Sequence, residues 1–300
     1  MIQESIYTRY QPEVNPAGPT GEDTLWFLFM QDRLLVYGLA DCPQLPTAAD
    51  LRQFHLTPEQ LLYLGTLDGR PCFTGGIQED TALPETTRFE ELRALFGCME
   101  DGLFLLAGRA LQIVHWHSMN RFCGRCGTPS EDKADERAKC CPNCGTVVYP
   151  TVSPAIIVAV ERGDTLLLAH AAHFKDNMYS VIAGYTEPGE TLEECVRREL
   201  SEEVSIAVKN IRYFGSQPWP YSGSLMVAFT AEYASGEIEV DHKEIEAAGW
   251  YTADQLPNIP NPISISRSLI DWFINRHTGQ NRENIMFNKL NNLGDYPFCT

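Results

Sequence analysis

The sequence predicts an α+β protein built from three consecutive parts and a tail. The chain has 300 residues, which is long enough for more than one hydrophobic core. Two cysteine pairs near its middle separate a region of short strands and helices from a region of longer apolar strands and helices. We therefore expect a small α+β domain at 1–118, a metal-bound ribbon at 119–150, a second domain at 151–277 and a tail at 278–300.

Charge and composition exclude some classes of protein. The formal net charge of −17 argues against a general nucleic-acid-binding protein, which needs a basic surface, so any contact with RNA would be local. No apolar run reaches the length of a membrane span, and the first residues lack the basic-then-apolar pattern of a signal peptide. We expect a cytoplasmic protein.

The first 118 residues carry no catalytic signature. Apolar patterns predict strands and a hairpin at residues 24–30, 33–37 and 65–74. Patterns of the form S/T-x-x-E/Q start at Thr57 and Thr87 and predict two short helices, and a longer helix is expected at 105–118. Arg93 is a candidate for reaching an anionic ligand, with a solvated helix arginine as the alternative.

The ribbon is predicted from four cysteines in two C-x-x-C pairs, namely Cys123, Cys126, Cys141 and Cys144. A glycine follows each pair, which suits the tight turn that directs two sulfurs at one ion. Four thiolates favour tetrahedral Zn²⁺ with no open position, so the site would be structural. Cysteines packed as small hydrophobic residues are the alternative, but the segment is polar. Cys140 falls outside the C-x-x-C register.

The second domain is predicted from its apolar strands and the helices between and after them. Strands are expected at 155–160, 165–169, 180–183, 211–214 and 225–233. Between the last two lies a segment with two prolines around a tryptophan, residues 216–224, which predicts a stiff loop. A short helix is expected at 252–256, and Pro262 is expected to open a C-terminal helix.

The helix that follows residue 190 carries acidic side chains in an unusual place. Thr191 and Glu194 form a capping box, and an apolar stripe follows at Leu192, Val196, Leu200 and Val204. Glu199 and Glu203 fall in nearly the same angular sector as the stripe, while Glu202 lies about 60° outside it. Carboxylates that converge at a buried face repel each other unless a cation lies between them, and oxygen ligands suit Mg²⁺ or Mn²⁺. A solvated acidic helix face is the alternative.

This segment resembles the Nudix box, G-x5-E-x7-R-E-U-x-E-E-x-G-U, in which U is apolar. The matching residues are Gly184, Glu190, Arg198, Glu199, Leu200, Glu202, Glu203 and Ile206. Ser205 stands where the family has glycine, at a helix end where a left-handed residue is common. If serine keeps that conformation, it would cost about 1–2 kcal/mol.

A second motif indicates one subgroup of this family. Residues 216–224 are similar to the array S-Q-P-W-P-F-P-x-S of the NADH pyrophosphatase subgroup of Nudix hydrolases, with Tyr221 and Ser222 as the departures. That subgroup also carries a zinc ribbon, so the resemblance covers about 119–275. It implies an α-β-α Nudix sandwich with a mixed sheet, and a homodimeric enzyme that hydrolyses NADH or NAD⁺ to nicotinamide mononucleotide and AMP. It also implies the removal of NAD caps from RNA.

The resemblance assigns roles to further residues. The Mg²⁺ or Mn²⁺ ligands would be Ala183 through its carbonyl, Glu199, Glu202, Glu203 and Glu244. Glu202 would complete the ligand set or position the water, and a surface acid is the alternative for Glu244. Glu190 and Arg198 would pair to hold the loop.

Aromatic side chains would provide flat surfaces for nicotinamide and adenine. The full set that we expect to contact substrate is Arg93, Glu136, Tyr149, Tyr185, Gln217, Pro218, Trp219, Pro220, Tyr221, Ser222, Gly223, Ser224 and Ser266. Two other interpretations stay open. One is a Nudix hydrolase for another dinucleotide, such as ADP-ribose or a diadenosine polyphosphate, and the other is a zinc-ribbon protein that binds or senses a ligand without cutting it.

Overall fold

The computed structural model describes residues 6–16, 21–175 and 177–278. Contacts within the chain divide it into two compact units, with the boundary between Thr151 and Val152. None of the helices in the described part is long and apolar enough to cross a membrane. The tail predicted at 278–300 lies almost wholly outside the described residues.

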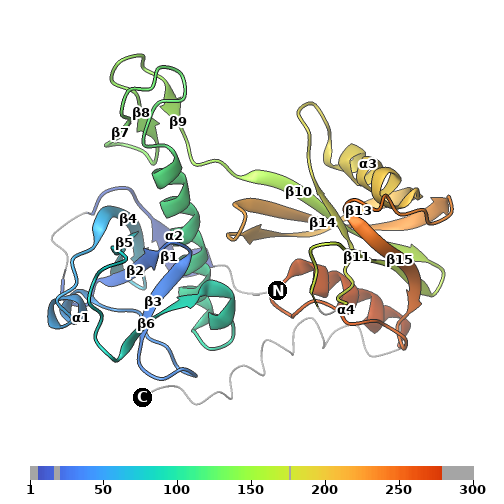
Figure 1. Ribbon diagram of the computed structural model, residues 1–300, viewed down its shortest axis with the longest axis horizontal. Coiled ribbons are helices and arrows are strands. Elements are labelled where there is room, and N and C mark those ends of the chain that lie inside the picture. The colour runs from blue at the N-terminus through green and yellow to red at the C-terminus, as the bar shows by residue number, and fades with distance from the viewer. Residues whose placement is uncertain (1–5, 17–20, 176, 279–300) are drawn as a thin grey trace. The chain divides into compact units, whose positions relative to one another are not determined.

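The first unit is built on a six-stranded sheet in the order β1-β4-β5-β2-β3-β6 (Figure 1). The strands are β1 (Tyr10–Pro12), β2 (Leu25–Met30), β3 (Arg33–Tyr37), β4 (Glu59–Leu67), β5 (Arg70–Gly76) and β6 (Thr87–Glu91). Its helices are η1 (Ile6–Thr8), α1 (Ala48–Gln53), η2 (Leu92–Leu95) and α2 (Asp101–Met119). The strands predicted at 24–30 and 33–37 and the long helix are confirmed.

The two short helices predicted from Thr57 and Thr87 are wrong. The segment after Thr57 is the strand β4, and the segment from Thr87 is the strand β6 followed by the 3₁₀ helix η2. Both strands pair with neighbouring strands, and this pairing overrides a local capping pattern. A capping box does occur nearby, at Thr47 and Asp50, where it starts α1. An aspartate rather than a glutamate completes it.

The ribbon consists of three two-residue strands, β7 (Glu131–Asp132), β8 (Lys139–Cys140) and β9 (Val147–Val148), in one antiparallel sheet. It belongs to the first unit and makes polar contacts with the rest of that unit. His117 Nε2 of α2 lies 3.1 Å from Asp132 Oδ2. Arg137 donates to the carbonyls of Glu13 and Tyr63 at 2.8 and 2.6 Å.

The second unit is an α-β-α sandwich around a mixed sheet, which confirms the expected fold. The sheet runs β13-β14-β10-β11-β15, and β12 also pairs with β10. Helices α3 and α4 lie on its opposite faces (Figure 1). The elements are β10 (Ser153–Arg162), β11 (Thr165–Ala171), β12 (Ile182–Tyr185), α3 (Leu192–Val204), β13 (Ala207–Trp219), β14 (Ser224–Ser235), β15 (Ile245–Thr252) and α4 (Ile265–His277).

The continuous apolar run of β10 is explained by these two layers. Successive side chains of a strand point to opposite faces. Ile156 and Val158 therefore pack in the core beneath α3, while Ile157 and Ala159 pack in the core beneath α4. A strand buried on both faces needs apolar residues at every position.

Three predictions in this unit need correction. The segment Ser216–Trp219 is the end of β13, paired with β14, and only residues 220–223 form the turn. No helix forms at 252–256, because β15 ends at Thr252 in a turn, and β15 itself was not predicted. Helix α4 begins at Ile265, where the Ser264 side chain accepts from the amide of Arg267, and not at Pro262.

The two sheets share one topology. The order β4-β5-β2-β3-β6 in the first unit corresponds to β13-β14-β10-β11-β15 in the second. In each, the second pair in this order is parallel (β5 with β2, β14 with β10) and the other neighbours are antiparallel. Along the chain, α1 stands where the second unit has α3, and α2 stands where it has α4.

Candidate active site

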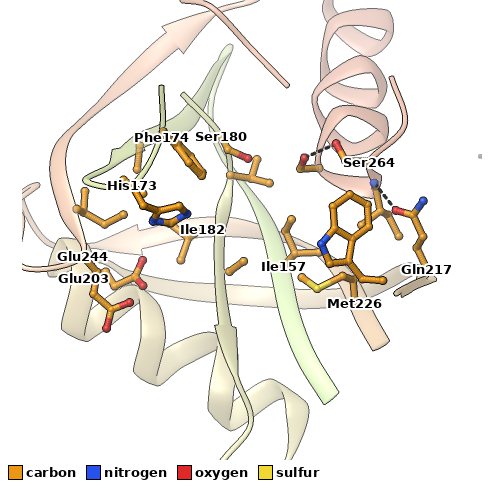
Figure 2. A pocket seen from close by; sticks show the side chains of 18 residues that line it. Ile157, His173, Phe174, Ser180, Ile182, Glu203, Gln217, Met226, Glu244 and Ser264 are labelled. Atoms are coloured by element: carbon orange, nitrogen blue, oxygen red, sulfur yellow. Dashed lines mark hydrogen bonds between the residues drawn. The ribbon is translucent and has the colours of Figure 1, made fainter. Parts of the chain in front are cut away.

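A cavity of about 260 Å³ lies in the second unit. Figure 2 draws Glu203, Glu244 and His173 toward one end of it, and Gln217 and Ser264 toward the other. Its lining residues are Ile157, Ala169, Ala171, His173, Phe174, Ser180, Val181, Ile182, Ala183, Glu203, Gln217, Trp219, Met226, Glu244, Ile245, Ser264, Ile265 and Ser266. The lining is mostly apolar, with acids at one end only.

Helix α3 places two of its glutamates toward the interior. Its capping box at Thr191 and Glu194 is present, and Val196, Leu200 and Val204 are fully buried. Glu199 and Glu203 are only 9% and 6% exposed, whereas the side chain of Glu202 is 61% exposed. The angular prediction from the sequence is therefore confirmed, and the acidic face of α3 is not a solvated one.

A glycine makes room for the Glu199 carboxylate. A Cβ atom on Gly184 would lie 2.0 Å from both Cδ and Oε1 of Glu199, far inside van der Waals contact. Gly184 lies on β12 directly after Ala183, which lines the cavity. This close approach brings the backbone of β12 and the carboxylate of α3 together.

Arg198 links the loop before α3 to the acids of the helix. It donates to both oxygens of Glu190, at 2.8 and 2.9 Å, to Glu199 at 2.9 Å and to Glu202 at 3.0 Å. The Arg198 guanidinium lowers the pKa of Glu190 to about 2. Glu202 faces solvent in this network and does not line the cavity, so of the three predicted catalytic glutamates only Glu203 does.

The surroundings of the Glu203 carboxyl group suit a bound cation. Burial, followed by repulsion from Glu199 and Glu244, raises the pKa of Glu203 to about 8. Burial also raises the pKa of Glu199. A divalent cation between these carboxylates would remove the repulsion, and oxygen ligands suit a hard ion. The residues therefore fit a divalent metal. Among the described residues, the ribbon thiols are the one group of three or more candidate ligands whose atoms all lie within 4.8 Å of one another.

Glu244 reaches the acidic end from a turn before β15. Asp241 shapes this turn, because its carboxylate accepts from the amides of Lys243, Glu244 and Ile245 at 3.2, 3.2 and 2.9 Å. These hydrogen bonds lower the pKa of Asp241.

The end of α3 has the conformation expected from its sequence. Ser205 adopts φ 58° and ψ 30°, the left-handed region that favours glycine. Its amide donates to the carbonyl of Ser201, and the acids of the helix are not involved. The departure from the box therefore affects the helix end only.

Gln217 and Ser224 are held by contacts within the protein. The Gln217 amide donates to the carbonyl of Ile263 at 2.8 Å and accepts from the amide of Ile265 at 2.7 Å, so it fixes the start of α4. Ser224 is fully buried, and its hydroxyl contacts those of Tyr185 and Ser222 at 3.0 and 2.8 Å.

The other residues of the predicted array lie around the same turn. Trp219 lines the cavity and meets Tyr221 edge to face, with ring centroids 4.9 Å apart. Ser266, near the start of α4, also lines the cavity. Pro218, Pro220, Ser222 and Gly223 complete the strand end and turn without lining it.

The four ribbon cysteines form one cluster. Sγ–Sγ distances of 3.6 Å (Cys123–Cys144), 3.4 Å (Cys126–Cys141) and 3.6 Å (Cys126–Cys144) approach the ~3.8 Å expected for zinc–sulfur bonds of about 2.3 Å. Each knuckle has the same amide hydrogen bonds and ends at a glycine with φ near 70°. Cys140 lies outside the cluster.

Three predicted substrate residues belong to the first unit. In the ribbon, the hydroxyl of Tyr149 donates to Glu136 Oε1 at 3.0 Å, and Lys133 pairs with the same carboxylate. Arg93 is exposed on η2. All residues that line the cavity belong to the second unit.

The structure also brings residues to the cavity that the sequence did not suggest. They are chiefly His173 and Phe174 after β11, Met226 on β14 and Ser264 before α4. No motif marks them. The only available signal was the pair of aromatic rings directly after a buried strand.

Comparison with known proteins covers most of the chain. The model of the NUDIX domain matches residues 150–273, and that of the NADH pyrophosphatase zinc ribbon domain matches 118–149. Residues 23–116 match the NADH pyrophosphatase-like rudimentary NUDIX domain. The shared topology of the two sheets agrees with this last match.

Two curated relatives are described as NAD-capped RNA hydrolase NudC. The protein from Deinococcus radiodurans is 41% identical over 257 residues, which is 84% of this chain and 88% of that protein. The one from Stutzerimonas stutzeri is 45% identical over 217 residues, or 72% and 78%. Among solved structures, a NUDIX hydrolase from Nitrosomonas europaea matches with a TM-score of 0.46 and 23% identity, over 53% of this chain and 94% of that one.

Proposed function

The chain belongs to the NADH pyrophosphatase subgroup of the Nudix hydrolases, and on this premise we propose that it hydrolyses NADH or NAD⁺ to nicotinamide mononucleotide and AMP. Because relatives are described as NAD-capped RNA hydrolases, the proposal includes removal of NAD caps from RNA. The observation that carries it is the pair of acids at one end of an otherwise apolar cavity, where the buried Glu203 meets the exposed Glu244. A pyrophosphate would bind at this end, and a base along the apolar remainder.

Nudix hydrolases need a divalent metal, and we propose Mg²⁺ or Mn²⁺ here. Glu199, Glu203, Glu244 and the carbonyl of Ala183 would hold it. When bound, the metal neutralises phosphate charge and lowers the pKa of water. Glu202 would act from the rim, by fixing Arg198 and so orienting Glu199.

The reaction divides the pyrophosphate into two phosphate monoesters. The oxygen of a water molecule forms a bond to one phosphorus as the bridging P–O bond breaks. The bridging oxygen leaves with the electron pair on the other phosphate, and the water gives its protons to a base and then to solvent. Glu203, which would be ionised once a metal is bound, and its neighbours favour this step by holding the water and the phosphate in place.

For substrate choice, we propose that Trp219 and Tyr185 offer flat surfaces to the bases, and that Gln217 acts indirectly by placing Ser266 at the start of α4. Tyr149 and Glu136 of the ribbon would add contacts, and the protein would act as a homodimer. The four thiolates of the ribbon would hold a structural Zn²⁺, which leaves no open position for chemistry.

The deciding experiment is a substrate panel with the purified full-length protein. We expect Mg²⁺- or Mn²⁺-dependent turnover of NADH to exceed that of ADP-ribose and diadenosine tetraphosphate. Equal or faster turnover of ADP-ribose would overturn the NADH assignment. Glu203→Gln should lose most activity with an unchanged circular dichroism spectrum, whereas a protein that binds NADH tightly and cuts nothing would be a ligand sensor.

The RNA activity needs its own assay. With an NAD-capped transcript as substrate, the expected product is intact RNA that carries a 5′-monophosphate. Absence of this product under conditions that support NADH hydrolysis would restrict the function to the free dinucleotide.

A further inference from the structure

The cavity contains one basic side chain, and the box does not account for it. Of the lining residues in the described chain, only His173, Glu203 and Glu244 carry titratable groups. A pyrophosphate that enters the acidic end meets two carboxylates and the metal they would hold. His173 is then the one lining side chain that can both donate a hydrogen bond to a phosphate oxygen and carry a positive charge.

The arginine that the box specifies, Arg198, is not available for this task. The guanidinium of Arg198 already donates to Glu190, Glu199 and Glu202, and to the carbonyl of Tyr185 at 2.9 Å. It is therefore committed to holding the acids. A phosphate oxygen that the metal does not reach would need a donor from another element.

The backbone around His173 is fixed beside the acidic end. The amide of Ala172 donates to the carbonyl of Glu244 at 3.0 Å, which ties the segment after β11 to the turn that carries Glu244. The amide of Phe174 donates to the carbonyl of Ala171 at 2.9 Å. The rings of His173 and Phe174 meet edge to face at 4.7 Å.

A second histidine braces the far side of the same segment. His170 Nδ1 lies 2.8 Å from the carbonyl of Met178, and its ring packs on Phe174 and Tyr179. The segment is thus attached at both ends, and Figure 2 shows the imidazole of His173 at the end where Glu203 and Glu244 lie. The backbone on either side of His173 is therefore held in place, and the exposed imidazole rests on the ring of Phe174, where a ligand can meet it.

We propose that His173 is a substrate-contacting residue that donates a hydrogen bond to a non-bridging phosphate oxygen of the pyrophosphate. The proposal rests on the proposed function and adds a phosphate contact from outside the box. It predicts selectivity for the phosphate group itself, since nothing in this contact recognises a base or a ribose.

The test compares His173→Ala and His173→Gln with a matched control, Lys175→Gln. Lys175 lies on the same segment and is exposed, but it does not line the cavity, so its variant loses a nearby positive charge only. For His173→Ala we expect kcat/KM for NADH to fall by roughly ten- to a hundredfold, the usual effect of one hydrogen bond to a charged group. His173→Gln, whose side chain can still donate a hydrogen bond, should regain part of the lost kcat/KM. Lys175→Gln should behave as the wild type.

Two probes separate a phosphate contact from a structural effect. In His173→Ala, inhibition of NADH hydrolysis by AMP should weaken about as much as kcat/KM falls, while inhibition by adenosine should not change. The Mg²⁺ concentration for half-maximal rate should also stay the same. Equal weakening of AMP and adenosine, an altered Mg²⁺ requirement, or wild-type kinetics in His173→Ala would each overturn the proposal.

A failure of the proposed function would look different. In that case the wild-type protein would not hydrolyse NADH at all. Calorimetric titration with inorganic pyrophosphate and Mg²⁺ then tests the contact directly. Tighter binding by the wild type than by His173→Ala would support it, and equal binding would refute it.

Discussion

The carboxylate of Glu199 occupies the space in which a side chain at position 184 would have to lie. The strand β12 and the helix α3 can therefore approach closely only because residue 184 is glycine. In the box, the glycine and the glutamate are fifteen positions apart, yet they work as one contact. This contact sets how closely the backbone of β12 approaches the carboxylates of α3.

Gly184→Ala should displace the Glu199 carboxylate without unfolding the protein. The added methyl group cannot fit at 2.0 Å, so either the side chain or the helix must shift. We expect a loss of at least tenfold in metal-dependent hydrolysis, because a displacement of about 1 Å costs up to a hundredfold. Gly76→Ala is the control, since a Cβ there meets its nearest atom at 3.9 Å. If both variants keep full activity, the close contact is not needed for catalysis.

The metal-free second unit should become less stable as the pH rises. The pKa of Glu203 is about 8 in the folded protein, against an ordinary value of 4.5. Between these values the folded state holds more protons than the unfolded state, so the free energy of unfolding falls as the pH increases through this window. With solvent screening allowed for, the fall should be roughly 2–4 kcal/mol.

This prediction is checked by urea unfolding between pH 4.5 and 8, after dialysis that removes Mg²⁺ but keeps zinc. Glu203→Gln stays neutral at every pH and should flatten the dependence. Adding Mg²⁺ should restore stability most strongly at the alkaline end, since the ion binds the charged form. A wild-type curve that matches that of Glu203→Gln would contradict the assignment.

Ser205→Gly should stabilise α3. Relief of the left-handed strain is worth about 1–2 kcal/mol, and the greater freedom of glycine in the unfolded chain offsets roughly half of it. A gain of up to about 1 kcal/mol should appear as a higher unfolding midpoint with unchanged kcat. Ser201→Gly, in the exposed interior of the same helix, should instead destabilise by about 0.5 kcal/mol.

Cys141→Ser should release the metal and unfold the ribbon, whereas Cys140→Ser should not. The two residues are neighbours, but only Cys141 belongs to the thiol cluster. Metal content per chain and protease cleavage within 119–150 are the measurements. Equal zinc loss in both variants would mean that the cluster is assigned wrongly.

The accuracy of the predictions depended on how local each signal was. Helix α3 was predicted well because its capping box and its apolar stripe lie within the helix itself. Thr57 and Thr87 carry similar capping patterns but lie in or beside strands, because pairing partners distant in the sequence decide their conformation. Likewise, Ser216–Trp219 was predicted as a loop from its prolines, although it pairs with β14 at the edge of the sheet.

The candidate site was predictable where a motif existed. The box led to Glu203, the array to Trp219, and the resemblance to the subgroup to Glu244, and all three line the cavity. His173 was not found, because its place beside Glu244 depends on the backbone contact between Ala172 and Glu244. The spacing correctly placed Glu202 outside the buried stripe, but it did not show that Arg198 donates to this exposed carboxylate.

The repeated topology of the two sheets allows a comparison within one chain. The first unit builds the same five-strand arrangement, but a six-residue α1 stands where the second unit has the acidic α3. The single acid of α1, Asp50, serves as its cap. This architecture therefore folds without a row of mutually repelling carboxylates. The carboxylates of α3 are therefore a property of the site and not a requirement of the scaffold.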